Sequence, residues 1–128
     1  MADLITPTPT PVKVTAAGKM NLFDAIDVAA YDMLDLQLLL VAATGTISSG
    51  SLQIKIITGM QRQVEDNSWL VTPTNFDDLS SLPSLPKSYL KTLNMGFLKY
   101  IRWSVEQWPA SGLTDITFLI RGIARSYR

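Results

Sequence analysis

The chain has 128 residues, of which 47% are hydrophobic and 17% charged, and its eleven basic and eleven acidic residues cancel. This length suits one domain with a single hydrophobic core, and a net charge of zero lacks the strongly positive field on which nonspecific nucleic-acid binding depends. Because the chain contains no cysteine and no histidine, disulfides, thiolate or imidazole metal sites, and Ser-His-Asp or Cys-His catalysis are excluded.

The first residues, "MADLITPTPTPVKV", have neither the basic n-region nor the apolar h-region of a signal peptide, so we expect a soluble protein made without export. Proline at every second position of 7–11 favours an extended arm. Two interpretations stay open, an arm ordered on a neighbouring molecule and a mobile tail. The chain therefore divides into an extended Pro/Thr-rich arm, 1–12, and one β-sandwich domain, 13–128.

The segment 22–34 is ambiguous between helix and strand. Its apolar residues approximate a helical stripe, and Ala and Leu favour helix. The same letters also fit a short strand, a turn at 31–33 and a strand over 34–41 whose even-numbered leucines face one way. The alternation favours strands. The longest apolar run, 38–43, is far shorter than the roughly 20 residues that span a bilayer, so we expect no membrane contact.

The next segments carry turn and strand signals in alternation. "TGTISSG" is a polar cluster of turn type, and "SLQIKIITG" alternates aliphatic and polar residues, so we expect an antiparallel hairpin between 34–41 and 52–57. A turn at 66–68 precedes a short strand at 69–72, and prolines limit regular structure from 73 to 87.

Two further strands are predicted from 89 to 107, divided at 94–96, although "SYLKTL" also fits a helical turn. "LTDITFLIRGIAR" alternates as a terminal strand. About seven to eight short strands at this spacing predict an all-β fold, an antiparallel, jelly-roll-like β-sandwich. The residues expected in its core are Leu36, Leu38, Leu52, Ile54, Ile101, Trp103, Phe118 and Ile120.

The stretch "FLKYIRWSVEQW" has the composition of both a core strand and a binding surface. A period of two assigns Ile101, Trp103 and Val105 to a core face and leaves Tyr100 and Arg102 on a half-polar face turned to water or a partner. Sugar or base stacking needs exposed coplanar aromatics beside cations. The aromatic candidates for such a platform are Trp69, Tyr100 and Trp108.

Carboxylates are the remaining candidates for chemistry. The aspartates at 24, 27, 32 and 35 and the pair at 77–78 have ligand atoms for calcium or for glycosidase catalysis. They lack the spacing of a calcium loop, and so short a chain rarely builds a glycosidase cleft. We therefore interpret them as turn caps and solvated surface, and expect no metal, no cofactor and no enzymatic activity.

Four stretches together resemble small β-sandwich proteins of tailed-bacteriophage virions, including capsid decoration (cement) proteins. They are "LDLQLLLVAATGTISSGSLQIKIITG", "EDNSWLV", "GFLKYIRWSV" and "ITFLIRGIAR". The resemblance covers about 34–125 and leaves the arm and the proline-rich loop unmatched. It implies a structural virion subunit without an active site, made in the host cytoplasm, that associates with itself, with trimers favoured, and with major capsid or other virion proteins.

The predicted partner-binding residues are Tyr100, Arg102, Arg121, Arg125 and Trp108. The arginines offer forked cations to acidic protein partners, whereas nucleic acid is not expected as a partner. An alternative function is a carbohydrate-binding or receptor-binding module of a phage tail, which would use the aromatic candidates.

Overall fold

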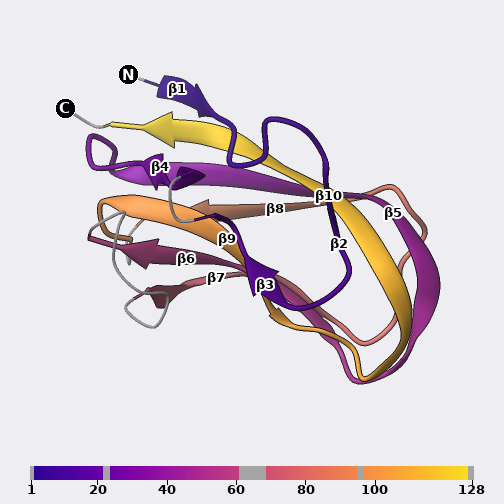
Figure 1. Cartoon of the computed structure of the whole chain (residues 1–128). Coiled ribbons are helices and arrows are strands. Elements are labelled where there is room, and N and C mark those ends of the chain that lie inside the picture. The colour runs from indigo at the N-terminus through magenta and orange to yellow at the C-terminus, as the bar shows by residue number, and fades with distance from the viewer. Residues whose placement is uncertain (1, 22–23, 61–68, 95–96, 127–128) are drawn as a thin grey trace.

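A computed structural model of the chain describes residues 2–21, 24–60, 69–94 and 97–126, and for 71–75, 77 and 78 it describes the backbone alone. The strands form two antiparallel five-stranded sheets that pack face to face (Figure 1). The β5/β10 sheet contains β1 (Ala2–Ile5), β2 (Val12–Val14), β5 (Met33–Ser49), β8 (Lys87–Leu93) and β10 (Ser111–Arg125). The β6/β9 sheet contains β3 (Gly18–Lys19), β4 (Ile26–Asp27), β6 (Leu52–Gly59), β7 (Leu70–Leu79) and β9 (Tyr100–Gln107).

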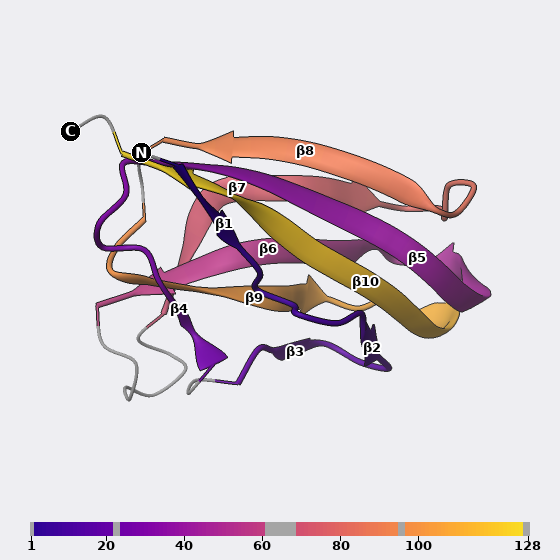
Figure 2. The ribbon, with the colours of Figure 1, turned by 90° about the horizontal axis from the view of Figure 1, so that it is seen from above.

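The strand order is that of a jelly roll. β1 and β2 pair end to end with β10, and β3 and β4 do so with β9, so each of these pairs acts as one interrupted edge strand. The sheets then run β1/β2, β10, β5, β8 and β3/β4, β9, β6, β7, and the chain changes sheet at every connection between these strands except β6 to β7. Figure 2 shows the two layers from above. The predicted all-β, jelly-roll-like antiparallel sandwich is confirmed.

The core lies between the sheets and is filled by alternate residues of the long strands. All eight residues predicted for it are buried. On β5 the leucines at 34, 36, 38 and 40 are at most 2% exposed. In the described part of the ambiguous segment 22–34, β4 and the first residues of β5 are strands, as the alternation favours. Trp103 meets Phe118 edge to face, with ring centroids 5.1 Å apart, so the core is closed by an aromatic contact between the two sheets.

The predicted hairpin between 34–41 and 52–57 is wrong, because β5 and β6 belong to different sheets. The polar segment 44–49 does not turn but continues β5 alongside β10, through register shifts near 111–115. Gly45 and Gly112 both have positive φ there, and a Cβ on Gly45 would lie 2.2 Å from the Gly112 carbonyl oxygen. Ile47 is buried, which anchors the extension in the core.

The proline-rich region is more regular than predicted, since β7 extends to Leu79 and only 80–86 lacks strand structure. β7 is the edge strand of its sheet, and Pro73 lies where its register with β6 shifts between Asn75 and Val71. Proline is tolerated at edges and bulges, because no ladder hydrogen bond is lost there. The expected turn at 66–68 lies outside the described residues.

The predicted strands on either side of 94–96 are β8 and β9, and the predicted terminal strand is β10, as expected. "SYLKTL" is part of β8, so its helical alternative is wrong.

Residues 2–14 lie along the edge of the chain's own β5/β10 sheet. Between β1 and β2, the buried Thr8 closes the gap in the ladder, because its amide donates to Ile120 O at 3.2 Å and its hydroxyl accepts a 2.7 Å hydrogen bond from Ile120 N. Neither interpretation of the arm from the sequence included this arrangement. The division of the chain at residue 12 stays a prediction.

Candidate docking surface

The face of the β5/β10 sheet that points away from the core is unusually aliphatic. Antiparallel sheets commonly carry polar side chains on such a face. Here Leu4 on β1, Leu90 on β8 and Ile123 on β10 are 72%, 76% and 39% exposed, and register places all three on the outward side. We call this side the outer face.

A groove of about 440 Å³ crosses the outer face from β8 to β1. Its floor is one row of paired residues, Gly122, Leu36 and Lys91. The neighbouring rows on either side of the floor form its two walls. The groove therefore runs across the strands rather than along them.

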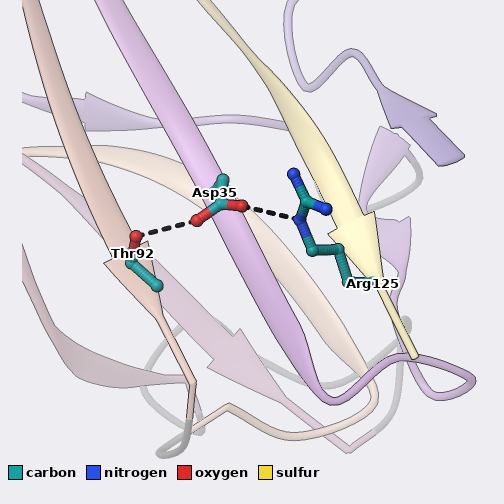
Figure 3. A network of polar contacts seen from close by, with 3 residues as sticks. All are labelled: Asp35, Thr92 and Arg125. Carbon is teal, nitrogen blue, oxygen red and sulfur yellow. Dashed lines mark hydrogen bonds and ion pairs between the residues drawn. The ribbon is translucent and has the colours of Figure 1, made fainter. Parts of the chain in front are cut away.

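The first wall contains Asp35 on β5, held between two strands (Figure 3). Arg125 Nε on β10 donates to Asp35 Oδ2 at 2.9 Å, and Thr92 Oγ1 on β8 donates to Asp35 Oδ1 at 2.8 Å. The Thr92 hydrogen bond, and then Arg125, lower the pKa of the Asp35 carboxyl below its ordinary value. The carboxylate is therefore fixed and compensated before any partner arrives. Leu4 and Ile123 extend this wall toward β1.

The second wall contains Arg121 on β10, Gln37 on β5 and Leu90 on β8. Arg121 Nε donates to Gln37 Oε1 at 3.1 Å, and Gln37 Nε2 donates to Ser88 Oγ at 3.3 Å. Among the described residues, Arg121 thus pairs with a neutral amide and has no carboxylate partner. Its charge remains available at the groove.

Of the predicted partner-binding residues, Arg121 and Arg125 lie together on the outer face. Tyr100 and Trp108 lie elsewhere and are half-buried, Tyr100 against a second, smaller core cluster and Trp108 against the main core. Trp69 is buried in the smaller cluster. The aromatic candidates therefore do not form an exposed stacking platform.

The expectation that Arg102 faces outward is wrong, because its side chain is only 2% exposed. The side of β9 away from the main core is covered by segments distant in sequence. Arg102 Nε donates to Met20 O at 2.7 Å, and its guanidinium lies 4.9 Å from the ring centroid of Trp69. Ser104, two residues further along β9 on the same side, is also buried.

Two of the aspartates named in the sequence analysis accept hydrogen bonds from other parts of the chain. Asp27 Oδ1 accepts a 3.0 Å hydrogen bond from Ala29 N, as a turn cap does, and Asp35 belongs to the groove wall. Within the described ranges, no group of three or more acidic, His or Cys side chains could hold a metal ion. The side chains of 77 and 78 lie outside the description.

Sequence reasoning missed Leu4, Leu90 and Ile123. A signal was present for Ile123, since the inward assignment of Ile116, Phe118 and Ile120 on β10 makes its odd-numbered residues outward. For Leu4 and Leu90 the sequence held no such signal. The sheet face on which each side chain lies is set by the pairing of its strand with β10 or β5.

No protein-family model matches the chain, and no curated protein sequence matches it. Among solved structures, the chain is similar to the SPBc2 prophage-derived protein YomS, with a TM-score of 0.45 and 15% sequence identity over 97% of this chain and 92% of that one. In the described part of the chain, no helix is long and apolar enough to cross a membrane.

Proposed function

We propose that this chain is a structural protein without catalytic activity, which binds neighbouring protein subunits through the outer face of the β5/β10 sheet. The observation that carries the proposal is the gathering of Leu4, Leu90 and Ile123 around one groove. Single exposed aliphatic residues are common on protein surfaces, but a cluster on one sheet face is typical of an interaction site.

The energetics of the outer face suit binding to a protein. Covering apolar surface contributes about 25 cal/mol per Å² removed from water. The polar side chains between the aliphatic ones, such as Asp35 and Gln37, are already held by neighbours on other strands. Groups that are ordered before binding lose less conformational entropy when a partner arrives.

The specific form that we propose is a capsid decoration protein of a tailed phage. This rests on the sequence resemblance to small virion β-sandwiches. In this role the chain associates with itself, as a trimer, and with the major capsid protein on the particle surface, and it needs neither cofactor nor nucleic acid.

The test uses particles purified from the phage that encodes the chain, with mass spectrometry to detect the protein on them. Wild-type protein and the double variant Leu90→Ser/Ile123→Ser are then added to particles that lack the protein. We expect the wild type to sediment with the particles and the variant to stay in solution. Light scattering on the free protein should show a trimer.

The matched control is Leu70→Ser, which removes an aliphatic side chain of similar exposure, 61%, from the other sheet. It should sediment like the wild type, and all variants should melt within a few degrees of it. Absence of the protein from particles would refute the virion role. Equal sedimentation of the double variant and wild type would refute the docking surface.

A further inference from the structure

We propose that the transverse groove binds an extended segment of a partner chain, about four residues long, with apolar side chains at both ends and a carboxylate between them. The inference rests on the proposed function, because it names the kind of partner element that the outer face would recognise. It is carried by the dimensions of the groove, the distribution of its charges and the position of its aliphatic residues.

The groove has the dimensions of a single extended chain. It spans β8, β5, β10 and β1, and strands lie about 4.8 Å apart, so its length is roughly 14 Å. An extended chain rises about 3.4 Å per residue, so roughly four residues fit. The walls are two residues apart along each strand, or about 7 Å, which admits one extended segment but no helix of about 10 Å diameter.

The charge of the groove favours an acidic ligand. Arg121 stands in one wall on the outer face and has no carboxylate partner among the described residues. The lining carboxylate, Asp35, is already engaged by Arg125 and Thr92. A carboxylate of the partner segment would therefore meet uncompensated positive charge, and Arg121 could bind it with its guanidinium fork.

The ends of the groove are apolar. Leu90 stands at the β8 end, and Leu4 with Ile123 stands at the β1 end. Apolar side chains at the two ends of the segment would cover these residues, while the acidic side chain lies near the middle. A second copy of this chain is a poorer occupant, because its own groove would bring the same unpaired cation, Arg121.

The experiment measures binding of a synthetic peptide, acetyl-Leu-Glu-Ser-Leu-amide, to the full ¹⁵N-labelled chain by backbone amide NMR. We expect saturable shifts confined to residues lining the groove, with a dissociation constant on the order of 1 mM. A second peptide with Gln in place of Glu isolates the contribution of the carboxylate. The spectrum of each protein variant also reports whether it is folded.

Arg121→Gln should weaken binding of the Glu peptide about tenfold and that of the Gln peptide less than about twofold, because only the first contains the charge that Arg121 contacts. The matched control is Lys87→Gln, which removes an exposed cation from the same strand as Leu90 but outside the groove lining. It should leave both affinities within about twofold of the wild type.

The inference is overturned by shifts that map elsewhere, by no shift at several millimolar peptide, or by an equal loss for both peptides in Arg121→Gln. Concentration-dependent groove shifts without peptide would instead identify a second copy as the occupant.

The peptide and particle experiments together distinguish this inference from the proposed function. If the peptide does not bind but the Leu90→Ser/Ile123→Ser variant no longer sediments with particles, the outer face binds a folded surface and the proposed function stands. If the peptide binds but this variant still sediments with particles, the proposed function fails while the groove ligand is supported.

Discussion

The guanidinium of Arg102 lies over the indole ring of Trp69, 4.9 Å from the ring centroid, on the side of β9 away from the main core. The same side chain donates hydrogen bonds to Met20 O. A buried arginine held in this way ties β9 to the segment before β4 and to the residue that precedes β7. It acts as a structural cation rather than as one offered to a partner.

Replacing Arg102 should therefore lower the free energy of unfolding and should not weaken docking. Arg102→Met removes the charge-assisted hydrogen bonds and the cation–π contact, and we expect a loss of about 2 to 4 kcal/mol in the free energy of unfolding. Urea denaturation followed by tryptophan fluorescence measures it. Arg121→Met on the exposed outer face is the control, with a change within about 0.5 kcal/mol. Equal stability of the two variants would contradict the structural role.

Trp103→Ala should create a cavity at the contact between the sheets. Trp103 is 8% exposed and packs edge to face on Phe118, so we expect a loss of about 3 to 5 kcal/mol. Trp103→Phe keeps most of the packing and should lose less. Thermal and urea unfolding measure both variants, and a change near zero for the alanine variant would place Trp103 at the surface.

The sequence was sufficient for the layers of the sandwich but not for the pairing of its strands. A period of two assigned Leu36, Ile54 and Phe118 to the core, because one buried face is a local property of each strand. It could not show that β5 and β6 lie in different sheets. That choice depends on the long register between β5 and β10, which no local pattern encodes.

The candidate site was predictable in part for the same reason. Arg121 and Arg125 belong to an alternating strand, β10, and lie on its outward side, as their positions indicate. Arg102 has the same pattern, yet its face is covered by Met20 and Trp69, which are distant in sequence. Alternation thus gives the side of a residue but not its exposure.

Thr8 should contribute to stability through its hydroxyl. In Thr8→Val the buried amide of Ile120 loses the acceptor that Thr8 Oγ1 provides at 2.7 Å, which should cost about 1 to 3 kcal/mol. Thr10→Val, at an exposed position of the same arm, is the matched control. Thermal unfolding separates them. Hydrogen exchange at Ile120 should also quicken in the Thr8 variant alone, and unchanged exchange would exclude Thr8 as its partner.

Asp35 should make stability depend on pH in the acid range. Its folded-state pKa lies below the ordinary value of 3.8, first because of the hydrogen bond from Thr92 and then because of Arg125. A lowered folded-state pKa means that the contribution is present above the unfolded pKa and is lost as pH falls through the folded one. Because the Asp35 side chain is 37% exposed, we expect less than about 1 kcal/mol.

The variant Thr92→Val removes the largest single cause, so the pKa of the Asp35 carboxyl should rise toward its ordinary value in a ¹³C NMR titration. Arg125→Gln should raise it as well, because Arg125 lowers this pKa through both its hydrogen bond and its charge. High salt should reduce the effect of Arg125 more than that of Thr92, because salt screens charge pairs and not neutral hydrogen-bond donors. A pKa that is the same in wild type and Thr92→Val would show that Asp35 is not held between β8 and β10, and the first wall of the groove would then not be preformed.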